Sequence, residues 1–179
     1  IASMIALTAV IFGTVFNAGF SLSISAIIAV LAGALCGLFN GILVTKLKVP
    51  SIILTIGTLT LYRGIAQAMA SDFSLGGYPS WFVGIDYRYV GIIPIPVIIF
   101  VVFALIVGVI LSSTIYGKQL YLIGTNPETA KYSGIKVDKI KLLLFVFSGF
   151  ISGVAGVLTT SRLAVARFNM ATGAELEIV

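Results

Sequence analysis

The sequence contains no histidine and only one cysteine, and charged residues make up just 9% of its 179 residues. Without histidine the chain lacks the commonest metal ligand and general base. A lone Cys36 cannot form a disulfide within the chain. We therefore expect neither a metal site nor a catalytic residue. Because a soluble domain carries roughly 25% charged residues, a chain so poor in charge is expected to lie in a lipid bilayer.

Long hydrophobic runs fill most of the sequence, and 59% of its residues are apolar. A helix needs about 20 apolar residues to cross the hydrocarbon core of a membrane. The segments that meet this length are roughly 1–20, 22–45, 51–71, 94–115 and 140–161. In lipid only helices and closed β-barrels satisfy their backbone groups, and these runs are too long and too uniform for barrel strands, so they predict helices. The predicted fold is an all-α, polytopic transmembrane helix bundle, a fragment with about five spanning helices.

The lysines predict the orientation of the bundle. Lys46 and Lys48 follow the second predicted span, and the remaining lysines all lie within 118–141. Two crossings separate these places, so both lie on one side of the membrane, which the positive-inside rule makes cytoplasmic. The loop over 72–93 is then expected outside. The net charge of +5 needs no nucleic-acid partner, because no basic face with interleaved aromatic residues is present.

Small residues recur at a spacing that predicts close packing between helices. Gly33, Gly37 and Gly41 are spaced by four in the second predicted span, and Gly149 and Gly153 have the same spacing in the fifth. In lipid this spacing lets two helix backbones approach closely. We expect these glycines to lie where helices cross.

Polar residues inside the third predicted span share one helical face. Thr60, Arg63 and Gln67 are separated by three and four residues, which places them above one another on a helix. An arginine within a span is costly in lipid and usually faces the bundle interior or a wet cavity. We predict that these residues, with Asn40, line a path for a hydroxyl-rich solute. The alternatives are a snorkelling or ion-paired arginine and an asparagine that joins two helices by a hydrogen bond.

One polar segment, IGTNPETAKYSGIKVDK at 123–139, interrupts the apolar sequence. Asn126 is a favourable N-cap residue, and Pro127 suits the first helical position. Gly134 has the position of a C-terminal stop. The segment predicts a short helix over 127–133 in a cytoplasmic loop.

This short helix has two interpretations, a well-capped loop or a rigid protrusion that docks in a groove of a cytoplasmic partner. The chain has no G-x-x-x-x-G-K-[ST] motif, so it is not expected to bind ATP phosphates itself. A transporter without its own ATPase would need such a docking element. The residues that would form it are Asn126, Pro127, Glu128, Ala130, Lys131, Ser133 and Gly134.

Three stretches together resemble the membrane permease subunits of bacterial ABC importers for monosaccharides. They are GALCGLFNGILVTKLKVPSIILTIGTLTLYRGIA, YGKQLYLIGTNPETAKYSGIKV with the helix that follows it, and NMATGAELEIV. The resemblance covers essentially the whole chain. It implies that residues 1–179 are the central part of one transmembrane permease domain, truncated at both ends, in the bacterial inner membrane.

The resemblance also implies a function and a set of partners. The chain would form the translocation path for a monosaccharide or a related small polyol, with the rhamnose-type or autoinducer-2 branch favoured. ABC ATPase subunits would dock on the 126–134 loop. A second permease subunit, identical or different, would complete the path, and an extracytoplasmic sugar-binding protein would deliver the cargo. ATP and Mg would bind to the ATPase, so this chain would hold no cofactor and would not be an enzyme; its other partner is membrane lipid.

Other functions compete with the sugar importer. A permease for another cargo, such as branched-chain amino acids or nucleosides, would differ in the residues that face the path. A passive channel would need no docking helix. An intramembrane enzyme would need a nucleophile with a base or a metal cluster within the spans, and a chain without histidine and with one cysteine offers neither.

Overall fold

The computed structural model describes residues 1–70, 74–85, 89–90, 93–170 and 172–173. Its helices are α1 (Ala2–Asn17), α2 (Leu22–Lys46), α3 (Ser51–Ala70), α4 (Ser80–Val83), α5 (Ile95–Ser113), α6 (Ile115–Thr125), α7 (Pro127–Tyr132) and α8 (Val137–Leu163). Two short strands, β1 (Tyr89–Val90) and β2 (Ile93–Pro94), pair antiparallel just before α5. The predicted all-α class is confirmed.

Four of the described helices, α2, α3, α5 and α8, are long and apolar enough to cross a membrane. Their bounds agree with the predicted spans to within one helical turn. The predicted first span coincides with α1, an apolar helix of 16 residues that begins at Ala2. Most of α1 is buried among the other helices.

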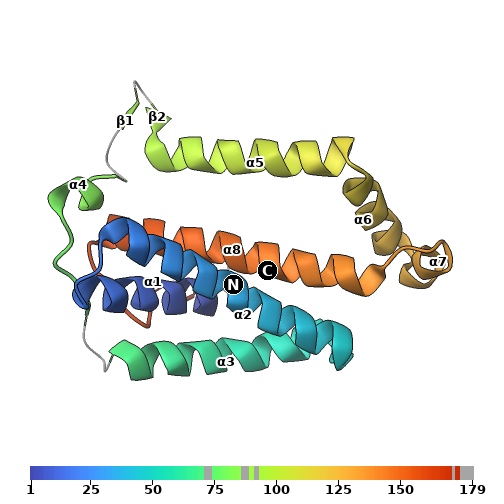
Figure 1. The fold of residues 1–179 in the computed structure, drawn as a ribbon, viewed down its shortest axis with the longest axis horizontal. Helices are drawn as coiled ribbons and strands as arrows, with labels where there is room; N and C mark the ends of the chain where they lie inside the picture. Colours follow the sequence, from blue (N-terminus) through green and yellow to red (C-terminus); the bar gives the residue numbers. More distant parts are fainter. Residues whose placement is uncertain (71–73, 86–88, 91–92, 171, 174–179) are drawn as a thin grey trace.

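The helices α1, α2, α3 and α8 form the bundle, and the interface between α2 and α8 is the most extensive (Figure 1). The predicted packing glycines lie in this interface. A Cβ atom on Gly149 would lie 2.9 Å from the Cα of Gly37, and a Cβ on Gly153 would lie 2.8 Å from the Cα of Val30. A Cβ on Gly33 would meet the backbone of Gly153, and one on Gly41 would lie 3.1 Å from the Cβ of Phe145. Only glycine permits this approach of the two backbones.

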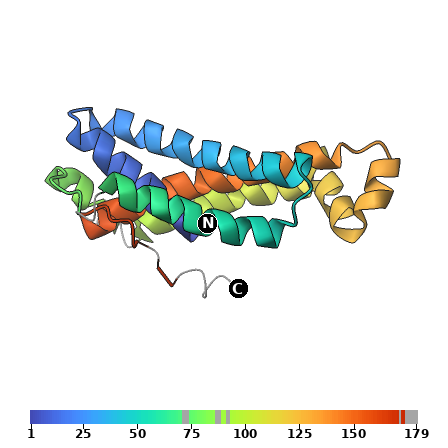
Figure 2. The same ribbon diagram turned by 90° about the horizontal axis from the view of Figure 1, so that it is seen from below.

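Different helices and loops lie at the two ends of the bundle. The end of α2, the start of α3, all of α6 and α7, and the start of α8 gather at one end (Figures 1 and 2). The two lysine-bearing regions therefore share an end, as the orientation prediction requires, and we treat this end as cytoplasmic. The short helix α4 and the strand pair lie at the opposite end.

Aromatic side chains fill the end of the bundle that carries α4. The ring of Tyr78 lies 5.4 Å from that of Phe12, 5.2 Å from that of Phe16 and 5.6 Å from that of Phe82, measured between ring centroids. Burial raises the pKa of the Tyr78 hydroxyl to about 12. The hydroxyl of Ser161 in α8 donates a hydrogen bond to the carbonyl of Phe82. These contacts fix α4 against α1 and α8.

The segment after α8 folds back towards α1. Leu75 and Ala166 exchange backbone hydrogen bonds of 3.0 and 2.7 Å. Ala166 and Met170 are buried against Ala9 of α1. The sequence did not decide where this segment lies, and the structure places its described part beside the loop that follows α3.

Helix α5 stands apart from the bundle. None of its residues is buried, and its main helical partner is α6. The rings of Phe103 in α5 and Phe150 in α8 approach to 6.5 Å between centroids. Figure 1 shows α5 running alongside α8, and apolar space separates the two helices near α6.

Candidate functional site

The helix α7 forms in the polar segment and begins at the predicted cap. The Oδ1 atom of Asn126 accepts hydrogen bonds from the backbone N–H groups of Glu128 at 2.9 Å and Thr129 at 3.2 Å. Pro127 occupies the first helical position, where no N–H donor is needed. Glu128 lies in the first turn, where the helix dipole favours a negative charge. The start of α7 is therefore fixed by its own side chains.

The C-terminus of α7 is fixed as firmly. Gly134 has a φ angle of +81°, which a residue with a side chain adopts only at a cost. Its N–H donates to the carbonyl of Lys131 at 3.0 Å, and the N–H of Ile135 donates to the carbonyl of Ala130 at 3.1 Å. This pair of bonds is a Schellman motif. The helix ends at Tyr132, with Ser133 as its C-cap, one residue before the predicted end.

Most of α7 projects into solvent. Within it only Ala130 is buried, whereas Tyr132 is 92% exposed. A cavity of about 560 Å³ separates the outer side of α7 from the start of α8. It is lined by Pro127, Glu128, Lys131, Tyr132, Val137, Asp138 and Lys141. The face is thus rigid and carries charges of both signs around one large exposed aromatic ring.

Helix α6, which carries α7 beyond the bundle end (Figure 1), was not predicted from the sequence. Thr114 separates α5 from α6 with an extended backbone, and its Oγ1 accepts a hydrogen bond from the N–H of Gly117 at 3.3 Å. A Cβ atom on Gly117 would collide with the backbone of Leu111. A capping threonine followed by a glycine was the available signal for this sharp turn.

Of the predicted solute-path residues, Thr60, Arg63 and Gln67 lie on one face of α3 and Asn40 lies on α2; that they line a path stays a prediction. Thr60 and Gln67 are exposed on α3, and Arg63 is half-buried. Asn40 is 2% exposed, and its Oδ1 lies 2.9 Å from the hydroxyl of Tyr62. Tyr62 faces the bundle, about 200° around the helix from Thr60 at 100° per residue. Asn40 therefore joins α2 to α3, as the alternative interpretation expected.

The structure also has a small polar cavity beside Asn40, which was not predicted from the sequence. Its volume is about 50 Å³, and its polar lining comes from Ser3, Asn40, Thr55, Thr58, Tyr62 and Ser148. A water molecule needs roughly 10–15 Å³ of such space. The cavity can hold a few water molecules and is too small for a sugar.

Comparison with known proteins identifies the family. Residues 1–179 match the family described as "Branched-chain amino acid transport system / permease component". The chain belongs to this permease family. The autoinducer 2 import system permease protein LsrC of Photorhabdus laumondii is 33% identical over 100% of this chain and 54% of the relative. The corresponding LsrD proteins of Yersinia enterocolitica and Escherichia coli are 32% and 34% identical over 94% of this chain and 53% of each relative.

The permease therefore spans about half the length of the curated relatives it matches. No solved structure matches it. The family and these relatives confirm the resemblance to ABC-importer permeases. Together with its apolar helices they place the permease in the bacterial inner membrane as a multi-pass protein.

Proposed function

We propose that this permease forms part of the translocation path of an ATP-driven importer for a monosaccharide or a related small polyol. An autoinducer-2-type or rhamnose-type cargo is favoured. The names of the relatives, autoinducer 2 import permeases, support the cargo class. The observation that carries the importer reading is α7, a helix capped at both ends and projecting from the lysine-rich end of the bundle.

In this proposal α7 docks in a groove of a separate ATPase subunit, which binds ATP and Mg. The chain itself binds no nucleotide and is not an enzyme. The link from α7 to α8 is short, residues 133–136, and the Schellman motif fixes its start. Because α8 packs closely on α2 through glycines, a displacement of α7 would move α8 and α2 together. ATP-driven movement of the ATPase would thus open the path to alternate sides.

The exposed side of α3 is the part of the path that this chain would supply. Tyr62, Ala66 and Ala70 face the bundle and are buried. Thr60 and Gln67, which share another side of the helix, are exposed. A second permease subunit, identical or different, would cover this side, so that polar groups line a path between subunits rather than contact lipid. An extracytoplasmic sugar-binding protein would deliver the cargo at the end that carries α4.

The family description favours a second cargo, a branched-chain amino acid. Arg63 could pair with the carboxylate of such a cargo, but α3 carries no acidic side chain for its ammonium group. A polyol needs neutral hydrogen-bond groups such as those of Thr60 and Gln67. Uptake of a labelled sugar, tested for competition by unlabelled leucine and by unlabelled rhamnose, separates the two. Competition by leucine alone would contradict the sugar assignment.

The importer proposal is tested with the full-length subunit reconstituted with its ATPase and binding protein. We compare wild type with the double variant Glu128→Arg and Gly134→Pro. The first substitution reverses a charge on α7, and the second excludes the positive φ angle at residue 134 that ends the helix. Lys46→Glu, a charge reversal at the same end of the bundle, is the matched control. The proposal expects the double variant to insert normally, to lose the ATPase during purification and to lose cargo-stimulated ATP hydrolysis. An ATPase that still binds and responds would reduce α7 to a capped loop.

A further inference from the structure

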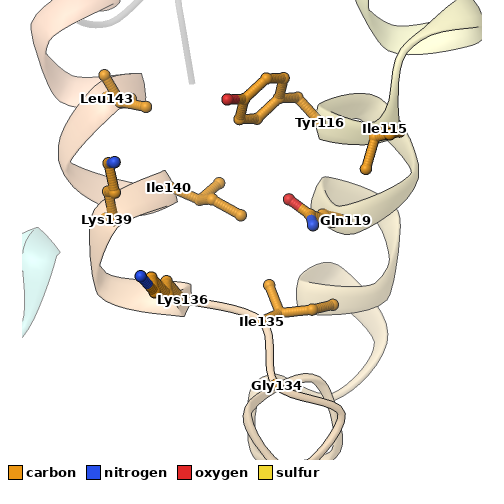
Figure 3. Close-up of a pocket in the computed structure, with 9 residues that line it drawn as sticks. All are labelled: Ile115, Tyr116, Gln119, Gly134, Ile135, Lys136, Lys139, Ile140 and Leu143. Carbon is orange, nitrogen blue, oxygen red and sulfur yellow. The ribbon is translucent and has the colours of Figure 1, made fainter.

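Two cavities adjoin each other between α6 and α8 at the cytoplasmic end. The first has a volume of about 370 Å³ and lies above the 134–136 turn (Figure 3). The second, of about 390 Å³, extends from it between α5, α6 and α8. Both are lined by Tyr116, Ile140 and Leu143. The two cavities therefore meet at these three side chains, and we call the pair the groove.

The two parts of the groove differ in chemistry. Lys136 and Lys139 line the first part, together with the amide of Gln119, and no carboxylate lines it among the described residues. Figure 3 shows Tyr116 and Gln119 of α6 pointing into the space opposite Ile140 of α8. The second part is lined by the Tyr116 ring and otherwise by residues without polar side chains, which come from the end of α5, from α6 and from the first half of α8. The first part, here the cationic chamber, thus has two lysines along its α8 side, and the second part, here the apolar channel, adjoins it.

The two parts of the groove lie at the levels where the headgroups and the acyl chains of the membrane are expected. The cationic chamber lies beside α7, at the lysine-rich end where lipid headgroups of the cytoplasmic leaflet are found. The apolar channel runs from there alongside the spans α5 and α8, towards the bilayer interior. Basic pockets between spans on the cytoplasmic side are known to bind anionic lipid headgroups.

We propose that this groove binds one anionic phospholipid from the cytoplasmic leaflet. Its phosphate lies between Lys136 and Lys139, Gln119 donates to a headgroup oxygen, and an acyl chain occupies the channel between α5 and α8. An acyl chain in this position would contact both α5, which has no buried residue, and α8. The chamber includes the 134–136 link to α7, so the bound lipid would also restrict motion between α7 and α8.

The test is native mass spectrometry of the full-length subunit in detergent, titrated with phosphatidylglycerol or with phosphatidylcholine. We expect phosphatidylglycerol to bind more tightly than phosphatidylcholine. The variant Lys136→Gln/Lys139→Gln should weaken phosphatidylglycerol binding roughly 30-fold, because each lysine near an anionic surface contributes about fivefold. Lys46→Gln/Lys48→Gln removes the same charge from the same end outside the groove and should bind as wild type does.

A second variant tests the apolar channel without touching charge. Leu143→Trp fills the part that both cavities share and should weaken binding, whereas Leu143→Met keeps the volume and should not. Equal affinity for both lipids, or an unchanged Lys136→Gln/Lys139→Gln variant, would overturn the proposal. Displacement of the lipid by millimolar inorganic phosphate would show an anion site without a lipid chain. Binding that ignores Leu143→Trp would show that another segment of the full-length protein fills the channel. None of these results depends on the cargo or on ATPase docking.

Discussion

Substituting Gly149 with alanine tests how closely α2 and α8 pack. The added Cβ would lie 2.9 Å from both the Cα and the N of Gly37, and closer still to the carbonyl of Gly33. Ordinary carbon contacts lie at about 3.5–4.0 Å, so the helices must separate by about 0.5–1 Å. A gap of that size forfeits a quarter to a half of the dispersion energy of each contact across it. We expect a loss of about 2 kcal/mol in the free energy of unfolding, within the range for overpacked interiors.

The matched control for this substitution is Gly57→Ala. Gly57 is also within a span, but none of the described residues lies within 4 Å of the Cβ it would gain. The control should be neutral or stabilising by up to about 1 kcal/mol, since alanine favours helix over glycine. The assay is the apparent melting temperature of the full-length subunit in detergent, by fluorescence-detected size-exclusion chromatography. A loss of 2 kcal/mol corresponds to roughly 4–8 °C for a domain of 150–250 residues and to a smaller shift for the longer full-length subunit. Equal melting of Gly149→Ala and wild type would refute the close-packing argument, as would an equal loss in Gly57→Ala.

Three further predictions concern single hydrogen bonds and backbone angles. Tyr62→Phe removes the hydroxyl beside the buried Oδ1 of Asn40 and should cost about 1–3 kcal/mol in the same melting assay; unchanged melting would show that water replaces the hydroxyl. Gly134 has a φ of +81°, so Gly134→Ala should destabilise the end of α7 by about 1–2 kcal/mol and lower cargo-stimulated ATP hydrolysis. Gly134→Asn should retain more of this hydrolysis than Gly134→Ala does. Higher hydrolysis in Gly134→Ala than in Gly134→Asn would be inconsistent with the Schellman motif. Burial raises the pKa of Tyr78 from 10.0 to about 12, so its contribution to stability is full below pH 10 and declines as the pH rises towards 12. Tyr78→Phe should therefore flatten the fall in melting temperature over that interval, and an unaltered slope would exclude Tyr78 as its cause.

The parts of the fold that local chemistry determines were predictable. Asn126 and Pro127 fix the start of α7 and Gly134 fixes its end through contacts within one turn, so the prediction erred by a single residue. The spans α2, α3, α5 and α8 follow from length and hydrophobicity alone. The predicted fourth span ended at 115, beside the break at Thr114, but the helix α6 that follows was not predicted, because its mixed polar and apolar residues do not distinguish a helix from a loop.

The surroundings of the polar residues in α2 and α3 could not be predicted from the sequence. Helical periodicity places Thr60, Arg63 and Gln67 on one side of α3, but it does not say which side faces the bundle. Packing of Tyr62 and neighbouring small residues against α1 decides that. The partner of Asn40 is likewise a tertiary fact, since the Tyr62 hydroxyl lies on another helix.

The most direct test of the account is whether α7 touches the ATPase in the assembled transporter. A photo-crosslinking amino acid would replace Tyr132, which is 92% exposed on α7, and in a second sample Trp81, which is 51% exposed on α4. The full-length subunits would be irradiated in membranes together with the ATPase. The account predicts a covalent adduct with the ATPase from position 132 and none from position 81. No adduct from position 132, or an equal adduct from both, would contradict the proposal that α7 couples this permease to ATP hydrolysis.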